Sequence, residues 1–99
     1  MQPNNPNELI RVHIWVKGRV QGVGFRAHVE YYSLQIGVFG WVRNIGRDVE
    51  TVAEGTREQI DKFIEMVKTG PRASRVDEAR VEYEPLTGQL SGFTVKRNM

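Results

Sequence analysis

The stretch GRVQGVGFR at residues 18–26 constrains the fold more than any other part of the chain. Three glycines, Gly18, Gly22 and Gly24, stand within seven residues, where an alternating apolar and polar pattern ends and a helical pattern begins. Glycine adopts backbone conformations that other residues avoid, so the stretch predicts a tight turn that joins a strand to a helix. Backbone amides at the start of a helix favour the binding of an oxyanion such as phosphate. The alternative is a turn without a ligand, in which the glycines only supply the backbone angles that the turn requires, as in most glycine-rich turns.

Arg26 ends this stretch and is predicted to lie in the first turn of the helix. A guanidinium binds an oxyanion through two parallel hydrogen bonds, so Arg26 is a candidate phosphate ligand. An arginine at the positive end of a helix dipole is slightly unfavourable unless an anion binds beside it. Residues that break a local rule in this way tend to mark functional sites. The alternative is a solvated arginine with no ligand.

The composition allows one small domain and excludes several kinds of chemistry. The chain has 99 residues, and we expect residues 1–8 to form a flexible tail before a single domain over residues 9–99. It has no cysteine, which excludes a disulfide scaffold and a thiolate nucleophile and favours a cytoplasmic location. The formal net charge of +2 is too balanced to indicate a nucleic-acid partner. No apolar run reaches membrane-spanning length and the start lacks a secretory signal, so we expect no membrane association.

The spacing of apolar residues predicts two helices and five strands. Phe25, Val29, Tyr32 and Ile36 recur at helical spacing and are expected to form the buried face of the first helix. Thr56 is expected to begin the second helix with a capping box. The predicted strands cover residues 10–16, 38–43, 48–54, 75–84 and 93–95, and the predicted helices cover residues 25–36 and 57–69.

This order predicts an α+β fold, a ferredoxin-like split βαβ sandwich in which two helices cover one face of an antiparallel sheet. The sheet is expected to have four strands, with residues 93–95 as a possible fifth at the edge. Residues 44–47, Asn-Ile-Gly-Arg, are expected to form a tight hairpin turn. The same architecture serves many functions, so function depends on the site rather than on the fold.

A second segment, GWVRN at residues 40–44, follows the first predicted helix. Together the two segments resemble the acylphosphatase family, whose signature pairs a G-x-V-Q-G-V-G-F-R loop with a later G-[WY]-V-[RK]-N segment. The resemblance runs from about Val12 to Val95 and includes VETVAEG at 49–55 and GPRASRV at 70–76. It implies the ferredoxin-like fold and a metal-independent enzyme that hydrolyses small acyl phosphates. The chain lacks the motifs of a P-loop or a dinucleotide site, so we expect no cofactor, and its strands and capped helices favour a monomer.

The resemblance also implies a role for particular residues. Arg26 would hold the phosphate oxygens, and Asn44 would orient the attacking water. An amide side chain suits that task because it donates and accepts hydrogen bonds without being a base. The alternative for Asn44 is a turn former that tolerates left-handed backbone angles. The backbone amides that would surround the phosphate belong to Val20, Gln21, Gly22, Val23, Gly24, Phe25 and Arg26.

The chain departs from the family pattern after Asn44, where the hairpin is one residue shorter than in many members. A misplacement of about 1 Å lowers a rate by on the order of a hundredfold, so we expect lower efficiency rather than another activity. One alternative is a domain that binds a phosphoryl or carbamoyl group without turning it over, as similar domains do within larger maturation enzymes. The other is an RNA-binding module, because GVGFRAHV at 22–29 loosely resembles an RNA-recognition motif.

Four further residues have an ordinary structural interpretation beside a functional one. His13 and His28 lack the spacing of metal ligands, so we expect no metal site. Trp15 and Trp41 are expected either to line a site entrance or to be ordinary strand aromatics.

Overall fold

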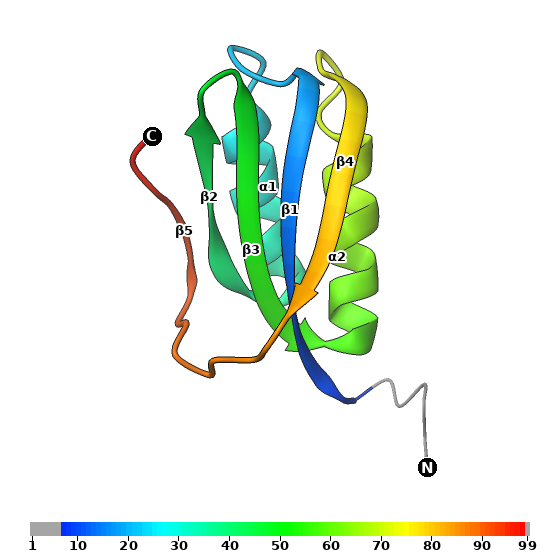
Figure 1. Ribbon diagram of the computed structural model, residues 1–99, viewed down its shortest axis with the longest axis vertical. Helices are drawn as coiled ribbons and strands as arrows, with labels where there is room; N and C mark the ends of the chain where they lie inside the picture. Colours follow the sequence, from blue (N-terminus) through cyan, green and yellow to red (C-terminus); the bar gives the residue numbers. More distant parts are fainter. Residues whose placement is uncertain (1–6, 99) are drawn as a thin grey trace.

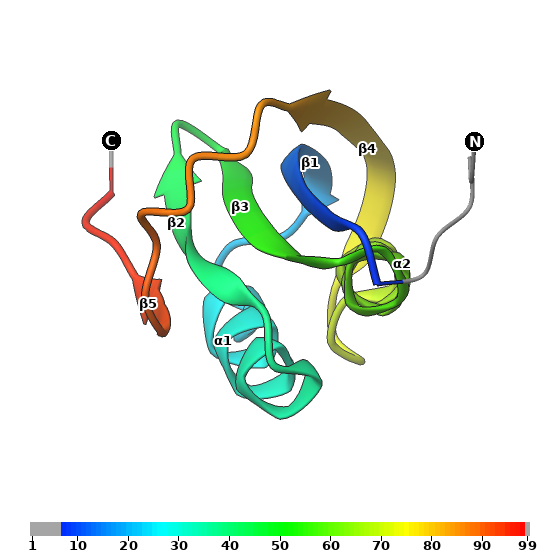
Figure 2. The same cartoon turned by 90° about the horizontal axis from the view of Figure 1, so that it is seen from below.

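The computed structural model describes residues 7–98 and contains one five-stranded sheet in the order β4-β1-β3-β2-β5. Both helices cover the same face of the sheet and leave the other face open (Figures 1 and 2). In chain order the elements are β1 (Leu9–Arg19), α1 (Phe25–Ile36), β2 (Phe39–Ile45), β3 (Asp48–Thr56), α2 (Arg57–Thr69), β4 (Arg75–Glu84) and β5 (Phe93–Val95). The predicted ferredoxin-like α+β architecture is therefore confirmed.

The prediction of a wholly antiparallel sheet is wrong at the last strand. Strands β1 to β4 pair antiparallel, but β5 runs parallel to β2. Strand β4 ends at the end of the sheet that lies away from the β2–β3 hairpin, and the chain crosses this end to reach the side of β2 (Figure 1). Strand β2 also starts at this end, so β5 runs in the same direction as β2 and pairs with it in parallel.

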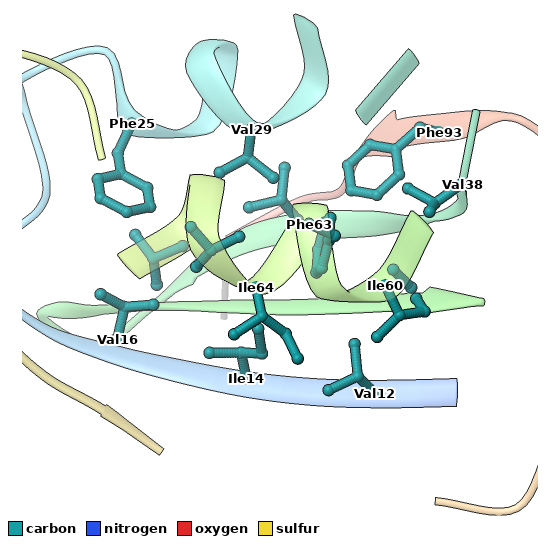
Figure 3. Packing of buried hydrophobic residues seen from close by; sticks show 14 of the residues in the cluster. Val12, Ile14, Val16, Phe25, Val29, Val38, Ile60, Phe63, Ile64 and Phe93 are labelled. Atoms are coloured by element: carbon teal, nitrogen blue, oxygen red, sulfur yellow. The ribbon is translucent and has the colours of Figure 1, made fainter. Parts of the chain in front are cut away.

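The hydrophobic core lies between the sheet and the two helices (Figure 3). Val12, Ile14 and Val16 alternate along β1 and are fully buried, as the period of two requires. Helix α2 covers them with a face that contains Ile60, Phe63, Ile64 and Val67. The predicted capping box is present at its start, where Thr56 Oγ1 accepts from the Gln59 amide at 3.1 Å and Gln59 Oε1 accepts from the Thr56 amide at 2.9 Å.

Helix α1 buries a narrower stripe than the sequence predicts. Phe25, Val29 and Ser33 are its buried residues, while Tyr32 is 43% exposed. A repeat of four residues follows one line along the helix, whereas Tyr32 lies beside that line and packs against the ring of His28. The expected burial of Tyr32 is therefore wrong.

Two turns also differ from their predicted limits. Strand pairing continues to Ile45 and Asp48, so the hairpin turn contains only Gly46 and Arg47 rather than residues 44–47. Gly18 lies in β1, at an irregularity in its pairing with β4, and not in the following turn. A Cβ at Gly18 would lie 2.1 Å from the carbonyl oxygen of Arg75, so this glycine permits a close approach of two strands.

The open face of the sheet carries an ion network centred on His13. Its Nδ1 lies 2.6 Å from Glu84 Oε2, and its Nε2 lies 2.6 Å from Glu50 Oε2. His13 therefore links the carboxylate of β4 to the carboxylate of β3 across β1. Burial raises the pKa of Glu50, but the bonds from Arg43 and His13 outweigh burial and lower that pKa.

Glu54 is the most strongly held carboxylate of this face. Its side chain accepts hydrogen bonds from Arg11 at 2.9 Å, from the amide and hydroxyl of Thr87 at 3.0 and 2.8 Å, and from the Gly88 amide at 3.1 Å. Burial raises the pKa of Glu54, but these bonds bring it from 4.5 to about 2. A carboxylate whose pKa is depressed by folding stabilises the fold above its unfolded pKa.

We predict that the free energy of unfolding falls as the pH drops from about 4.5 through about 2, because the Glu54 carboxylate must then be protonated. Its contribution near neutral pH is on the order of 3 kcal/mol. Urea unfolding between pH 2 and 7 measures it. Glu54→Gln is expected to lower the free energy of unfolding at pH 7 and to weaken its fall below about pH 4.5. Glu58→Gln, on the exposed side of α2, is the matched control. A free energy of unfolding that falls below about pH 4.5 in Glu54→Gln as steeply as in the wild type would contradict the prediction.

Candidate active site

The loop between β1 and α1, the β2–β3 hairpin and the loop between α2 and β4 gather at one end of the sheet (Figure 1). A cavity of about 350 Å³ lies at this end, beneath the first of these loops and against the start of α1. Its lining residues are Val20, Gln21, Gly22, Gly24, Phe25, Arg26, Ala27, Glu30, Asn44 and Val95. The structure therefore brings the predicted loop, Arg26 and Asn44 to a single cavity. Val23 is absent from this lining and packs against the hydrophobic core.

Helix α1 begins with backbone amides that no side chain caps. Gly24 is the residue before the helix, and its backbone has a left-handed conformation with φ 78°. Its lack of a side chain leaves no capping oxygen, and the first turn of the helix carries no acidic residue. The positive end of the helix dipole therefore meets the cavity without a negative group of its own. These features favour the binding of an anion.

Arg26 is the second residue of α1 and lines the cavity, as the sequence predicts. Its Nη1 donates to Asn98 Oδ1 at 3.0 Å. Asn98 is exposed and uncharged, and it accepts only one of the five N–H donors of a guanidinium. Within residues 7–98, no carboxylate forms an ion pair with Arg26. The positive charge is therefore available to a bound anion.

Asn44 lies near the end of β2 on the face that the helices cover, and only 9% of it is exposed. It pairs with Val49 of β3 in extended backbone, and no residue between 7 and 98 other than glycine has a positive φ. The interpretation of Asn44 as a left-handed turn former is therefore wrong. No hydrogen bond within the described chain occupies its side-chain amide, which reaches the cavity.

Strand β3 lies between β1 and β2, so direct strand pairing does not bring Asn44 beside the glycine loop. Gln21 closes the gap instead. Its Nε2 donates to the carbonyl oxygens of Gly46 and Asp48, each at 2.9 Å. Gly46 lies in the hairpin turn and Asp48 directly follows it, so one side chain joins the glycine loop to the hairpin that begins just after Asn44. The backbone amide of Gln21 is a predicted part of the site, whereas the sequence does not reveal these side-chain hydrogen bonds.

Three further residues line the cavity that were not predicted from the sequence, namely Ala27, Glu30 and Val95. Glu30 lies one helical turn after Arg26, and the i, i+4 spacing is a signal that places both on one face of α1. Val95 comes from β5, and no local pattern indicates that this strand pairs with β2.

The two tryptophans do not line the cavity. Trp15 stacks on His13 with ring centroids 3.8 Å apart, and Trp41 meets the edge of the same ring at 6.1 Å. Arg80 lies over Trp15 and Lys96 over Trp41, each within 4.3 Å of the ring centroid. Both tryptophans therefore belong to the open face of the sheet, as ordinary strand aromatics do.

A sequence model described as acylphosphatase matches residues 12–95, which include the whole cavity. The chain belongs to the acylphosphatase family. The curated acylphosphatase of Trichormus variabilis is 48% identical over 93 residues, which are 92% of this chain and 90% of that protein. The crystal structure of acylphosphatase from Bacillus subtilis superposes with a TM-score of 0.84 at 34% identity and covers 88% of this chain and 98% of that one.

A solved structure of full-length HypF in a phosphate- and nucleotide-bound form is also similar, with a TM-score of 0.84 and 27% identity. The match covers 92% of this chain but 12% of HypF. The acylphosphatase fold therefore occurs both as a whole chain and as a small part of a longer protein.

We predict that Gln21→Leu loosens the link between the glycine loop and the hairpin. The loss of two hydrogen bonds is expected to lower the free energy of unfolding by about 1–2 kcal/mol. Amide hydrogen exchange is expected to speed up in residues 20–24 and 46–48 while the rest of the sheet keeps its protection. Gln35→Leu, at an exposed position of α1, is the control. Unchanged exchange in both segments would show that Gln21 does not hold them together.

Proposed function

We propose that this member of the acylphosphatase family hydrolyses the carboxyl–phosphate bond of small acyl phosphates and releases a carboxylate and inorganic phosphate. The observation that carries the proposal is the single cavity shared by the glycine loop, Arg26 and Asn44. The family model and the curated relatives support it.

The reaction requires little from the protein. The leaving group is a carboxylate, which is already stable at neutral pH, so no strong general acid has to protonate it. The transition state of phosphoryl transfer is loose, with negative charge spread over the equatorial oxygens. Catalysis therefore depends on positioning the reactants and on stabilising that charge.

Arg26 and the amides of residues 20–26 would supply the positive environment. The guanidinium would bind two phosphoryl oxygens, and the amides of the loop would surround the group at the positive end of α1. Asn98 accepts one hydrogen bond from Arg26, and a phosphate would replace this neutral acceptor with a charged one. These donors stabilise the phosphoryl group most strongly in the transition state, where negative charge accumulates on its oxygens.

Asn44 would place the attacking water. Its amide group has both an acceptor oxygen and two donor hydrogens, so it can fix the orientation of a water molecule without removing its proton. Asn44 lines the cavity beside the shortened hairpin, and the Gln21 side chain bonds to that hairpin. The reduced efficiency expected from that hairpin stays a prediction.

We propose that the reaction needs neither a metal nor an organic cofactor. Within residues 7–98 no three His, Asp or Glu side chains form a group that could hold a metal ion. Among the described residues, Arg26 and Glu30 are the only ones with charged side chains that line the cavity. A chelator is accordingly expected to leave the rate unchanged.

Arg26→Ala is predicted to lower kcat/KM for benzoyl phosphate by on the order of a thousandfold or more, because a principal charge-stabilising group is lost. Asn44→Ala is predicted to lower kcat by about a hundredfold through loss of the ordered water. Inorganic phosphate should separate the two roles. Its inhibition constant is expected to rise about tenfold in Arg26→Ala and to change by less than about threefold in Asn44→Ala.

Arg72→Ala, in the exposed loop after α2, serves as the control arginine variant, and circular dichroism checks the fold of every variant. The assay contains a chelator. Full activity in Asn44→Ala would show that this residue does not place the water. Turnover that is lost in the presence of the chelator would show that a metal takes part.

A second candidate function is phosphoryl or carbamoyl binding without rapid turnover, and the similarity to part of HypF is the observation that favours it. It predicts phosphate binding that depends on Arg26, with no hydrolysis by the wild type. An RNA-binding function has no such support, because residues 22–29 lie in the loop and α1 rather than on a strand of the sheet.

We further propose that the enzyme acts as a cytoplasmic monomer. The proposed mechanism takes the glycine loop, Arg26 and Asn44 from one chain, as a monomeric enzyme requires. The absence of cysteine fits a reducing compartment. Among residues 7–98, no helix is long and apolar enough to cross a membrane.

A further inference from the structure

Three cavity residues, Ala27, Glu30 and Val95, have no part in holding the phosphoryl group or the water. The glycine loop, the first two residues of α1 and Asn44 account for the rest of the lining. With the phosphoryl group against the glycine loop and Arg26, the part of the cavity that is left for the acyl group is the part lined by these three residues. This step rests on the proposed function.

Glu30 is the only charged residue among the three. It lies on α1 four residues after Arg26, so both side chains are on the same face of the helix, about one turn apart. This spacing would suit an ion pair, but Arg26 bonds to Asn98 instead. Within residues 7–98, the Glu30 carboxylate has no hydrogen-bond or ion-pair partner. A free negative charge therefore lies in the wall of a cavity whose other features favour anions.

We propose that Glu30 is a specificity-determining residue that selects acyl phosphates by the charge of their acyl group. It favours an acyl group that carries an ammonium, as aminoacyl phosphates do, and accepts a neutral one. It disfavours an acyl group with a second anionic group. A charge pair near a protein surface interacts weakly but measurably, so we expect about a three- to tenfold effect for each sign of charge.

Ala27 and Val95 leave Glu30 as the residue of this wall that can distinguish acyl groups by charge. Their side chains are apolar, so these side chains form no hydrogen bond with an acyl group of either charge. Val95 is 41% exposed, which leaves this side of the cavity open to substituents of different size. Charge, rather than shape, is therefore the property that this wall can distinguish.

The test uses three aromatic acyl phosphates that share one ring and one reacting group. They are benzoyl phosphate, 4-(aminomethyl)benzoyl phosphate and 4-carboxybenzoyl phosphate. We expect kcat/KM of the wild type to fall in the order aminomethyl, unsubstituted, carboxy, with about a tenfold or larger ratio between the two extremes. In Glu30→Gln the ratio is expected to shrink to within about twofold of unity. Glu65→Gln, an exposed carboxylate variant on α2, should keep the wild-type ratio.

The corresponding benzylphosphonates give a readout that needs no turnover. Their dissociation constants, measured by calorimetry at low salt, should follow the same order and lose it in Glu30→Gln. A high salt concentration should weaken the order in the wild type, because it screens partly exposed charges. Glu30→Asp keeps the charge and should retain part of the selection.

The outcomes separate this inference from the proposed function. Hydrolysis with a ratio that Glu30→Gln leaves unchanged would overturn the role of Glu30 while the activity stands. No hydrolysis by the wild type, with phosphonates that still bind in the expected order, would overturn the activity and support the charge selection. Equal affinity of the wild type for all three phosphonates would overturn the charge selection by Glu30.

Discussion

The position of β3 between β1 and β2 determines where every part of the cavity lies. The chain leaves β1 on one side of β3 and must cross the end of that strand to reach α1. The hairpin that joins β2 to β3 turns at the same end (Figure 1). Glycine loop and hairpin therefore meet above β3, and two hydrogen bonds from Gln21 join them. Without this crossing, Arg26 at the start of α1 and Asn44 near the end of β2 would belong to separate surfaces.

The cavity relies on backbone and helix dipole more than on side chains. An uncapped helix start, one arginine and one amide side chain are its principal polar features. Such a site suits a reaction whose leaving group needs no proton and whose transition state spreads its charge over several oxygens. A chain of 99 residues has room for little more, because most of its buried side chains are needed for the core. The ion network lies on the opposite face of the sheet, and within residues 7–98 the cavity lining carries the charges of Arg26 and Glu30 alone.

Local patterns predicted the elements well because each has a strong local signal. The alternation in β1 and the capping box of α2 are examples, and so are the glycines before Arg26. The features that the sequence did not reveal depend on contacts between distant segments. The direction of β5 follows from where β4 ends, and the partners of the Gln21 side chain lie in the hairpin. Tyr32 has the right spacing to be buried but lies beside the narrow stripe that α1 presents to the core. For the same reason Val95, which joins the cavity only through strand pairing, has no signal in the sequence.

The most direct test of the site is a titration of ¹⁵N-labelled protein with inorganic phosphate, followed through the backbone amide signals. We expect saturable shifts concentrated in residues 20–26, with smaller shifts at Asn44 and its hairpin. In Arg26→Ala the same amides should shift only weakly at the same phosphate concentration. Shifts centred on the open face of the sheet would contradict the assignment of the phosphate to the glycine loop. A titration curve that Arg26→Ala leaves unchanged would contradict the role of Arg26.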